Sequence, residues 1–199
     1  MSKTQPALIA AGAARSLSGY NRAVHDWYQE GPEIVDALLD VEEQFGGFPG
    51  RCWDPAAGGG NIPERMKARG MEAFGSDIAR RDYGIGGLDF LTVPTHPVSC
   101  IVSNPPFKLL KPWTFKALAS TSFKVALLAR WSWYESVGRD DLFGRGTHYP
   151  TPLARVWMSA KRVSMPPGGF NLEAKGGKVP YAWFVFVHGH QGPPALGRI

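Results

Sequence analysis

The chain has 199 residues, 44% of them hydrophobic and 20% charged, a composition typical of one globular domain and not of a disordered or fibrous protein. No segment approaches the roughly 20 consecutive apolar residues that span a bilayer, and residues 1–16 make a poor secretory signal because their apolar part is mostly alanine. The formal net charge of +5 is uneven, with −4 on residues 1–89 and +9 on residues 90–199, as expected of a protein that binds a polyanion, although a solvated basic surface would look the same.

Hydrophobic spacing predicts helices that alternate with strands through the first 130 residues. The segments with helical spacing are 32–45, 61–69 and 111–119. The segments typical of strands are 50–54, 71–76, a short one near Leu88, 98–103, 123–129, 155–158 and 182–187. This alternation favours a parallel, doubly wound α/β sheet. Cys52 and Cys100 each lie in an apolar run, and two buried thiols suit a reducing cytoplasm better than a disulfide scaffold.

Three polar clusters fall where predicted strands end, at residues 54–61, at Asp77 and at residues 104–107. Ligands of parallel α/β sheets bind outside the carboxyl ends of the strands. We therefore expect the three clusters to meet in one functional site.

The first cluster, DPAAGGGN at residues 54–61, is a glycine-rich turn between a strand and a helix, where the backbone can approach a ligand closely. A dinucleotide fingerprint would need a glycine in place of Pro63, and a phosphate-binding loop would need Lys and Ser or Thr where Asn61 and Ile62 stand. Asp54 would also repel a pyrophosphate. The turn thus favours a cofactor that carries positive charge, and a tight turn without any ligand is the alternative.

Asp77 ends the next predicted strand, 23 residues after Asp54. A carboxylate at this place can accept hydrogen bonds from both hydroxyls of a ribose, or it can cap a helix. Together the two acids describe a nucleoside cofactor with a cationic, phosphate-free tail. S-adenosylmethionine meets that description.

The third cluster is the tetrapeptide Asn104-Pro105-Pro106-Phe107, which follows the predicted strand at residues 98–103. An adenine amino group is a poor nucleophile, because its lone pair is delocalised into the ring. The side-chain oxygen of Asn104 and the carbonyl of Pro105 can accept its two N–H protons and aim the lone pair at a methyl sulfonium, without a base of raised pKa. The prolines stiffen the loop, and Phe107 offers an apolar face to a base that has left its stack. A proline-rich loop without chemistry is the alternative.

The order of four motifs, DPAAGGGN (54–61), SDI (76–78), LDF (88–90) and NPPF (104–107), resembles that of S-adenosylmethionine-dependent amino-methyltransferases. The resemblance is strongest to the adenine-N6 DNA methyltransferases, in particular the small single-domain enzymes of phages and prophages, and covers roughly residues 24–190. The run at residues 25–39 is similar to the family's N-terminal cofactor motif, in which an aromatic residue and a proline precede a helix. Here Gln29-Glu30-Gly31 stand between them.

The resemblance implies a role for each matched residue. The cofactor residues would be Trp27, Tyr28, Asp54, Pro55, Ala56, Gly58, Gly60, Asn61, Asp77, Ile78, Asp89, Phe90 and Asn104. Among them, residues 54–58 would hold the methionine part and Asp77 the ribose, while Ile78, Asp89 and Phe90 would surround the adenine. The catalytic tetrapeptide would be Asn104, Pro105, Pro106 and Phe107.

The resemblance also implies a Rossmann-like class I methyltransferase fold. We expect a largely parallel seven-stranded sheet with antiparallel C-terminal strands and helices on both faces. The domain would span residues 23–190, between a flexible tail at 1–22 and a C-terminal tail at 191–199. No separate target-recognition domain fits in this length, so sequence specificity should be short and carried by loops.

Basic and aromatic residues accumulate in the second half. Lys108 follows the tetrapeptide and could contact a phosphate that flanks the target base. Arg130, Trp131 and Trp133 could stack on bases, unless the tryptophans belong to the core. The loop at residues 160–180 is a candidate nucleic-acid clamp, with a plain disordered loop as the alternative. Its basic residues are Lys161, Arg162, Lys175 and Lys178.

These patterns predict methyl transfer to the N6 amine of adenine in DNA, in the cytoplasm of a bacterium or a phage-infected cell. Adenine in RNA is an alternative, because its methylation uses the same tetrapeptide. A glutamine amide of a protein is another, although similar tetrapeptides then usually end in Tyr, and a non-catalytic subunit that keeps the fold is a third. No metal site is expected, since His188 and His190 lack further ligand residues nearby.

Overall fold

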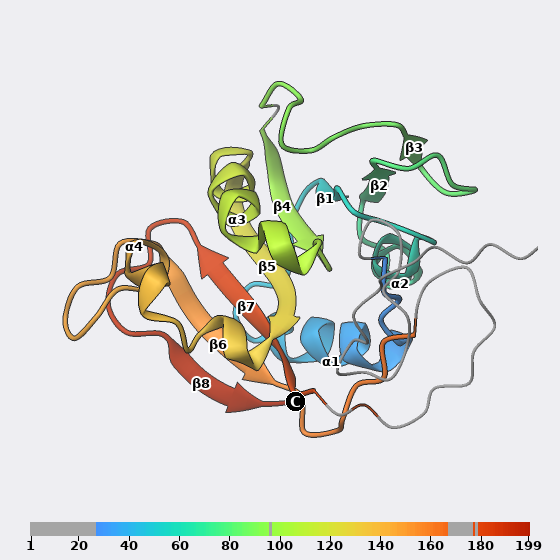
Figure 1. The fold of residues 1–199 in the computed structure, drawn as a ribbon. Coiled ribbons are helices and arrows are strands. Elements are labelled where there is room, and N and C mark those ends of the chain that lie inside the picture. Colours follow the sequence, from blue (N-terminus) through green and yellow to red (C-terminus); the bar gives the residue numbers. More distant parts are fainter. Residues whose placement is uncertain (1–26, 96, 167–176, 178) are drawn as a thin grey trace, which may run out of the picture.

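An eight-stranded sheet runs through the computed structural model, which describes residues 27–95, 97–166, 177 and 179–199 (Figure 1). In spatial order the strands are β3 (Ile85–Gly86), β2 (Ala73–Asp77), β1 (Cys52–Asp54), β4 (Val98–Ser103), β5 (Thr121–Arg130), β7 (Tyr181–Val187), β6 (Leu153–Met158) and β8 (Ala195–Arg198). The first five of these are parallel, β7 is antiparallel to both its neighbours, and β8 is parallel to β6. The expected sheet is confirmed, with eight strands instead of seven.

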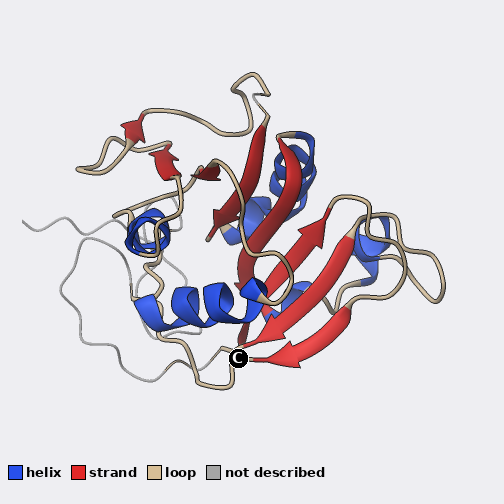
Figure 2. Ribbon diagram, turned by 180° about the vertical axis from the view of Figure 1, so that it is seen from behind, coloured by secondary structure: helices blue, strands red, loops and turns tan. Residues whose placement is uncertain are grey.

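Helices cover both faces of the sheet (Figure 2). The helices are α1 (Pro32–Glu43), α2 (Asn61–Ala68), α3 (Leu110–Ala119) and α4 (Asp140–Phe143), with short 3-10 turns η2 (Phe107–Leu109), η3 (Trp131–Trp133) and η4 (Val137–Arg139). In β4, Cys100 and Val102 face the core under α1 and α2, whereas Ile101 faces the core under α3 and α4. Burial on both faces explains why this strand is a continuous apolar run. None of the helices in the described residues is long and apolar enough to cross a membrane.

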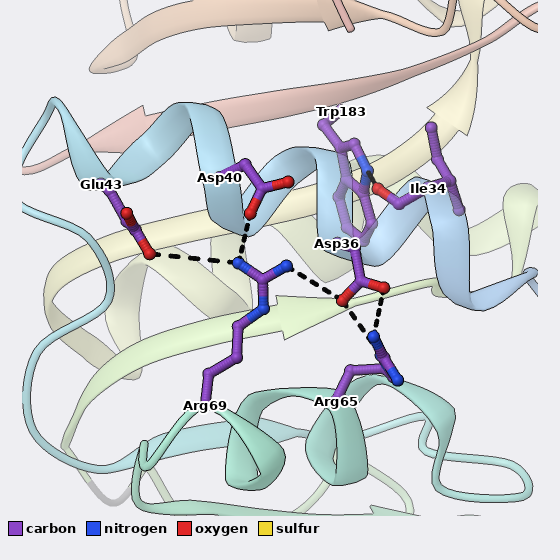
Figure 3. A network of polar contacts seen from close by, with 7 residues as sticks. All are labelled: Ile34, Asp36, Asp40, Glu43, Arg65, Arg69 and Trp183. Atoms are coloured by element: carbon purple, nitrogen blue, oxygen red, sulfur yellow. Dashed lines mark hydrogen bonds and ion pairs between the residues drawn. The ribbon is translucent and has the colours of Figure 1, made fainter.

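Helices α1 and α2 are tied together by ion pairs. Figure 3 shows the polar contacts of this region, which involve Ile34, Asp36, Asp40, Glu43, Arg65, Arg69 and Trp183. Arg69 pairs with both Asp36 and Asp40, and Arg65 donates through Nε to Asp36 at 3.0 Å. Each partly exposed pair contributes little to stability. Together they fix the direction of α2, whose first residue closes the glycine-rich turn.

The short strand expected near Leu88 is β3, which ends at Gly86. Another feature of the fold differs from the expectation. Residues 191–199, expected as a tail, include β8, which pairs with β6 and covers the unpaired backbone groups of that strand. Gly197 permits this pairing, since a Cβ there would lie 2.1 Å from the ring of Trp157. The expected N-terminal tail at residues 1–22 lies outside the described part of the chain.

The parallel strands place the three polar clusters at one edge of the sheet. Strands β1, β2 and β4 end at Asp54, Asp77 and Ser103. The chain goes from β1 to β2 on one side and returns to β4 on the other side of β1. Such a change of direction leaves a crevice beyond the strand ends, which is where α/β sheets bind ligands.

Candidate active site

A cleft of about 700 Å³, partly open to solvent, lies at this edge of the sheet. The expected cofactor residues that line it are Trp27, Tyr28, Pro55, Ala56, Gly58, Asn61, Asp77, Ile78, Asp89, Phe90 and Asn104. Asp54 and Gly60 do not line it. Two charged residues that the sequence analysis did not assign, Glu30 and Arg81, do.

The glycine-rich turn is held in shape by Asp54. Its Oδ1 accepts hydrogen bonds from the backbone N–H of Ala56 at 3.0 Å and from the hydroxyl of Ser103 at 2.7 Å. Burial raises the pKa of Asp54 to about 8, although the bond from Ser103 acts in the opposite direction. The turn also requires Gly58, whose φ is +54° and whose added Cβ would lie 2.4 Å from Nε1 of Trp27. Asp54 thus shapes the turn, and a cation in the adjacent cleft would favour its charged form.

The carboxylate of Asp77 lines the cleft at the end of β2. Its Oδ2 accepts a hydrogen bond from the backbone N–H of Gly58 at 2.9 Å, and its Oδ1 accepts one from the N–H of Ala79 at 2.8 Å. Residues 78–84 form bends and loop, so the alternative that Asp77 caps a helix is wrong. The side chain instead joins the turn after β1 to the turn after β2.

Arg81 brings a positive charge to the same wall of the cleft. Its Nε lies 3.4 Å from Oδ2 of Asp77, and its guanidinium lies 3.7 Å from the ring centroid of Trp27. Within the described residues, this buried Nε makes no hydrogen bond. Arg81 is thus held against Asp77 and Trp27 in the wall of the cleft.

Hydrogen bonds fix the segment before α1 beside the cleft. The N–H of Gln29 donates to the carbonyl of Pro166 at 3.0 Å, and its side-chain Nε2 donates to Oδ1 of Asn61 at 3.2 Å. Asn61 returns a hydrogen bond of 2.8 Å from Nδ2 to the carbonyl of Glu30. The segment is thereby bound to the first residue of α2.

The same segment binds the tetrapeptide. Nδ2 of Asn104 donates to the carbonyl of Tyr28 and to Oε2 of Glu30, both at 2.8 Å. Glu30 is 7% exposed, and its burial raises its pKa to about 7, against the lowering effect of the bond from Asn104. The sequence analysis noted the insertion Gln29-Glu30-Gly31 but assigned it no contact. The signal in the sequence that could have identified Glu30 is that it is an acid next to the expected N-terminal cofactor motif.

The four residues of the tetrapeptide lie in two different environments. Asn104 and Pro106 line the cleft, whereas Pro105 and Phe107 do not. The ring of Phe107 lies 5.8 Å from that of Tyr181, and the guanidinium of Arg130 lies 5.1 Å from the centroid of Phe107. In the described residues, the buried Nε of Arg130 has no hydrogen-bond partner.

Tyr181 belongs to this group but was missed by sequence reasoning. It begins β7 and is the register partner of Arg130, which ends β5. Burial raises its pKa, and the nearby Arg130 partly offsets this. The antiparallel pairing of β5 with β7 was the only signal that could have placed it beside Phe107.

The other candidate nucleic-acid residues separate into surface and core. Lys108, Lys161 and Arg162 are exposed. Trp133 is 4% exposed and its ring lies 4.8 Å from those of Phe143 and Phe184, so its expected stacking on bases is corrected to a place in the core. Trp131 is half-buried. Lys175 and Lys178 lie outside the described residues.

The remaining cofactor residues surround one end of the cleft. Ile78 is 50% exposed, as an apolar side chain at a ligand-binding surface can be. Phe90 is buried and packs 4.3 Å from the ring centroid of Trp113. Asp89 accepts a hydrogen bond from the N–H of Leu91 at 3.0 Å. No cluster of three or more His, Cys, Asp or Glu side chains suited to a metal ion occurs within the part of the chain that the structure describes.

Comparisons with known proteins bear on the fold. No protein-family model matches this sequence, and no curated protein matches it. An RNA methyltransferase candidate from Pyrococcus horikoshii has a TM-score of 0.59 at 14% identity, over 82% of this chain and 88% of that one. A protein from Thermoplasma acidophilum has a TM-score of 0.56 at 14% identity, over 78% and 89%. The modification subunit of a candidate type I restriction enzyme from Vibrio vulnificus has a TM-score of 0.54 at 14% identity, over 86% and 47%.

The chain has the Rossmann-like fold of a class I methyltransferase. This confirms the fold class expected from the motifs. At 14% identity the likeness concerns the fold alone, and the chemistry of the site has to be argued from its residues.

Proposed function

We propose that the protein is an S-adenosylmethionine-dependent methyltransferase that methylates the N6 amine of adenine in DNA. The observation that carries the proposal is the position of the tetrapeptide after β4. Asn104 lines the cleft, while Phe107 lies outside it against Tyr181 and Arg130. One end of the tetrapeptide can thus meet a cofactor and the other an acceptor base.

The residues of the cleft fit S-adenosylmethionine. Glu30, Asp54 and Asp77 are three buried carboxylates in or beside it. Asp77 faces Arg81, and a cationic ligand would compensate for the burial of Glu30 and Asp54. Asp77 would accept from the ribose hydroxyls, and Gly58 would let the methionine part approach the backbone. When bound, the cofactor supplies a methyl group activated by a sulfonium.

The chain's own residues would hold the acceptor amine. Oδ1 of Asn104 and the carbonyl of Pro105 would accept its two N–H protons, which localises the lone pair on the nitrogen. The nitrogen becomes positively charged on methylation and then loses a proton to water, so no base is required. Phe107 would stack on the base, with the buried Tyr181 and the guanidinium of Arg130 packed against its ring.

Several features support a nucleic-acid substrate. Lys108 is exposed next to Phe107, and Lys161 and Arg162 are exposed as well. One structural neighbour is described as an RNA methyltransferase candidate and another as a restriction-enzyme modification subunit. We prefer DNA and treat adenine in RNA and a glutamine amide as outcomes of the test.

The test is incubation with radiolabelled S-adenosylmethionine and three acceptors, namely duplex DNA, structured RNA and a protein mixture rich in glutamine. Digestion of labelled DNA to nucleosides should yield N6-methyldeoxyadenosine. Label in RNA or protein alone would move the substrate to that class, and no label in any acceptor would contradict the proposed function.

Phe107→Ala tests the assignment of the two ends of the tetrapeptide. Transfer should fall at least a hundredfold because the base loses its platform, while cofactor affinity should stay within about threefold because Phe107 does not line the cleft. Phe115→Ala is the matched control, since Phe115 is 41% exposed on α3 and outside the site.

A further inference from the structure

The hydrogen-bond partners of the Asn104 side-chain amide are compatible with only one of its two orientations. A side-chain amide nitrogen carries two N–H donors. Both find an acceptor at 2.8 Å, one on the carbonyl of Tyr28 and the other on Oε2 of Glu30. A carbonyl and an ionised carboxylate cannot donate, so beside ionised Glu30 a flipped amide would place its oxygen against two acceptors. Oδ1 of Asn104 is therefore the atom left for a ligand.

The backbone around Glu30 is held in place by hydrogen bonds. Its carbonyl accepts a hydrogen bond from Nδ2 of Asn61 at 2.8 Å, and the preceding Gln29 is bound to Asn61 and Pro166. The side chain is 7% exposed and lines the cleft. A hydrogen bond to a carboxylate is about twice as strong as one between neutral groups. Of the two acceptors, Glu30 is thus the stronger.

Resting on the proposed function, we propose that Glu30 is a positioning residue for methyl transfer. Its carboxylate holds the nitrogen of Asn104, so that Oδ1 of Asn104 is presented to the acceptor amine. Without this contact the amide can turn and offer an N–H to a substrate that itself carries N–H groups. Two N–H donors would then face each other. The substrate amine that receives the methyl group would lose one of the two hydrogen bonds that expose its lone pair.

Two variants distinguish the effect of the hydrogen bond to Asn104 from the effect of the negative charge of Glu30. Glu30→Gln removes the charge but keeps an oxygen that can accept from Asn104, and Glu30→Ala removes both. Glu33→Gln is the matched control, because Glu33 is an exposed acid at the start of α1. Turnover is measured at saturating cofactor and DNA, and KM for DNA is measured separately.

We expect Glu30→Ala to lower kcat at least tenfold, the effect of one charge-assisted hydrogen bond, with KM for DNA changed less than about threefold. Glu30→Gln should keep more of kcat than Glu30→Ala because it keeps an acceptor for Asn104, and Glu33→Gln should stay within about threefold of the wild type. Wild-type turnover in Glu30→Ala would overturn the proposal. An equal loss in Glu30→Gln and Glu30→Ala would also overturn it, because glutamine keeps the acceptor.

A second measurement does not depend on any substrate. The side-chain ¹⁵N–¹H signals of Asn104, identified by their loss in Asn104→Asp, should show slow exchange with water in the wild type and in Glu30→Gln. One of the two protons should exchange faster in Glu30→Ala. Unchanged exchange there would overturn the role of Glu30. Failure of the wild type to methylate any acceptor would instead contradict the proposed function, while the exchange data would still decide on Glu30.

Discussion

The carboxylate of Asp77 accepts a hydrogen bond of 2.9 Å from the backbone N–H of Gly58, across 19 residues of sequence. It joins the acid at the end of β2 to the glycine-rich turn after β1. The side chain assigned to the ribose therefore also fixes the backbone that would meet the rest of the cofactor. The two motifs form one structural unit.

Asp77→Asn should weaken the binding of S-adenosylmethionine by about 1.5–3 kcal/mol, the weight of a hydrogen bond to a charged group. Asparagine keeps one of the two oxygen acceptors, so one of the backbone bonds from Gly58 and Ala79 can persist while the charge is lost. Isothermal titration calorimetry measures the affinity. Asp82→Asn, an exposed acid on the same loop, is the control. Equal affinities for wild type and Asp77→Asn would contradict the assignment.

Gly58→Ala should lower the stability of the free protein by about 1–2 kcal/mol, because φ is +54° at this position and a left-handed backbone is strained for any residue with a Cβ. The added Cβ would also displace Trp27. Gly59→Ala is the matched control, since its Cβ would meet only Nε2 of Gln29, at 3.7 Å, and its φ is not left-handed. Thermal unfolding without cofactor compares the two. Equal Tm values would show that Gly58 carries no backbone constraint.

The sequence was sufficient for the features that are local. Strands appear as apolar runs, and the polar residues that end them are adjacent in sequence, so Asp54, Asp77 and Asn104 could be placed at one edge. The prediction of a buried pair of free thiols, Cys52 and Cys100, is confirmed for the same reason.

Contacts between distant segments could not be predicted. Glu30 and Asn104 are 74 residues apart, and nothing in either segment indicates the other. Tyr181 reaches Phe107 only because β7 pairs antiparallel with β5. The exposed edge strand β8 has no alternating apolar pattern, since it has no core to face.

Asp54→Asn should make the free protein more stable at high pH. Burial raises the pKa of Asp54 to about 8, so the folded state retains a proton that the unfolded chain has lost above pH 4. The free energy of folding that this retained proton contributes is present at low pH and is lost as the pH rises through 8. A change of one in pKa corresponds to about 1.4 kcal/mol, so the gain should be measurable.

Urea unfolding of wild type and Asp54→Asn at pH 5 and pH 9, without cofactor, checks this prediction. The difference in unfolding free energy should favour the variant at pH 9 and shrink toward pH 5. Asp82→Asn, an exposed acid on the loop after β2, controls for the loss of a negative charge. A variant that is less stable than the wild type at pH 9 would show that the charged carboxylate is stabilising.

A buried ionic group ties α1 to the antiparallel half of the sheet. Glu42 is fully buried and accepts from Arg155 at 2.8 Å, from Nε1 of Trp157 at 2.7 Å and from Nζ of Lys124 at 2.8 Å. Lys124 is fully buried as well and also donates to the carbonyl of Gly47 at 2.6 Å. Burial alone would raise the pKa of Glu42, but the bonds from Arg155, Lys124 and Trp157 hold it below its usual value.

The two members of this buried pair should differ in what their removal does. Glu42→Gln should destabilise the protein by about 3–5 kcal/mol, because the ammonium of Lys124 stays buried without its counter-charge. Lys124→Met should cost less, since Glu42 keeps Arg155 and Trp157. The neighbouring exposed Glu43→Gln should stay within about 0.5 kcal/mol of the wild type. Urea unfolding at pH 7 ranks the three, and a larger loss in Lys124→Met than in Glu42→Gln would mean that packing of the lysine stem, and not charge compensation, determines stability here.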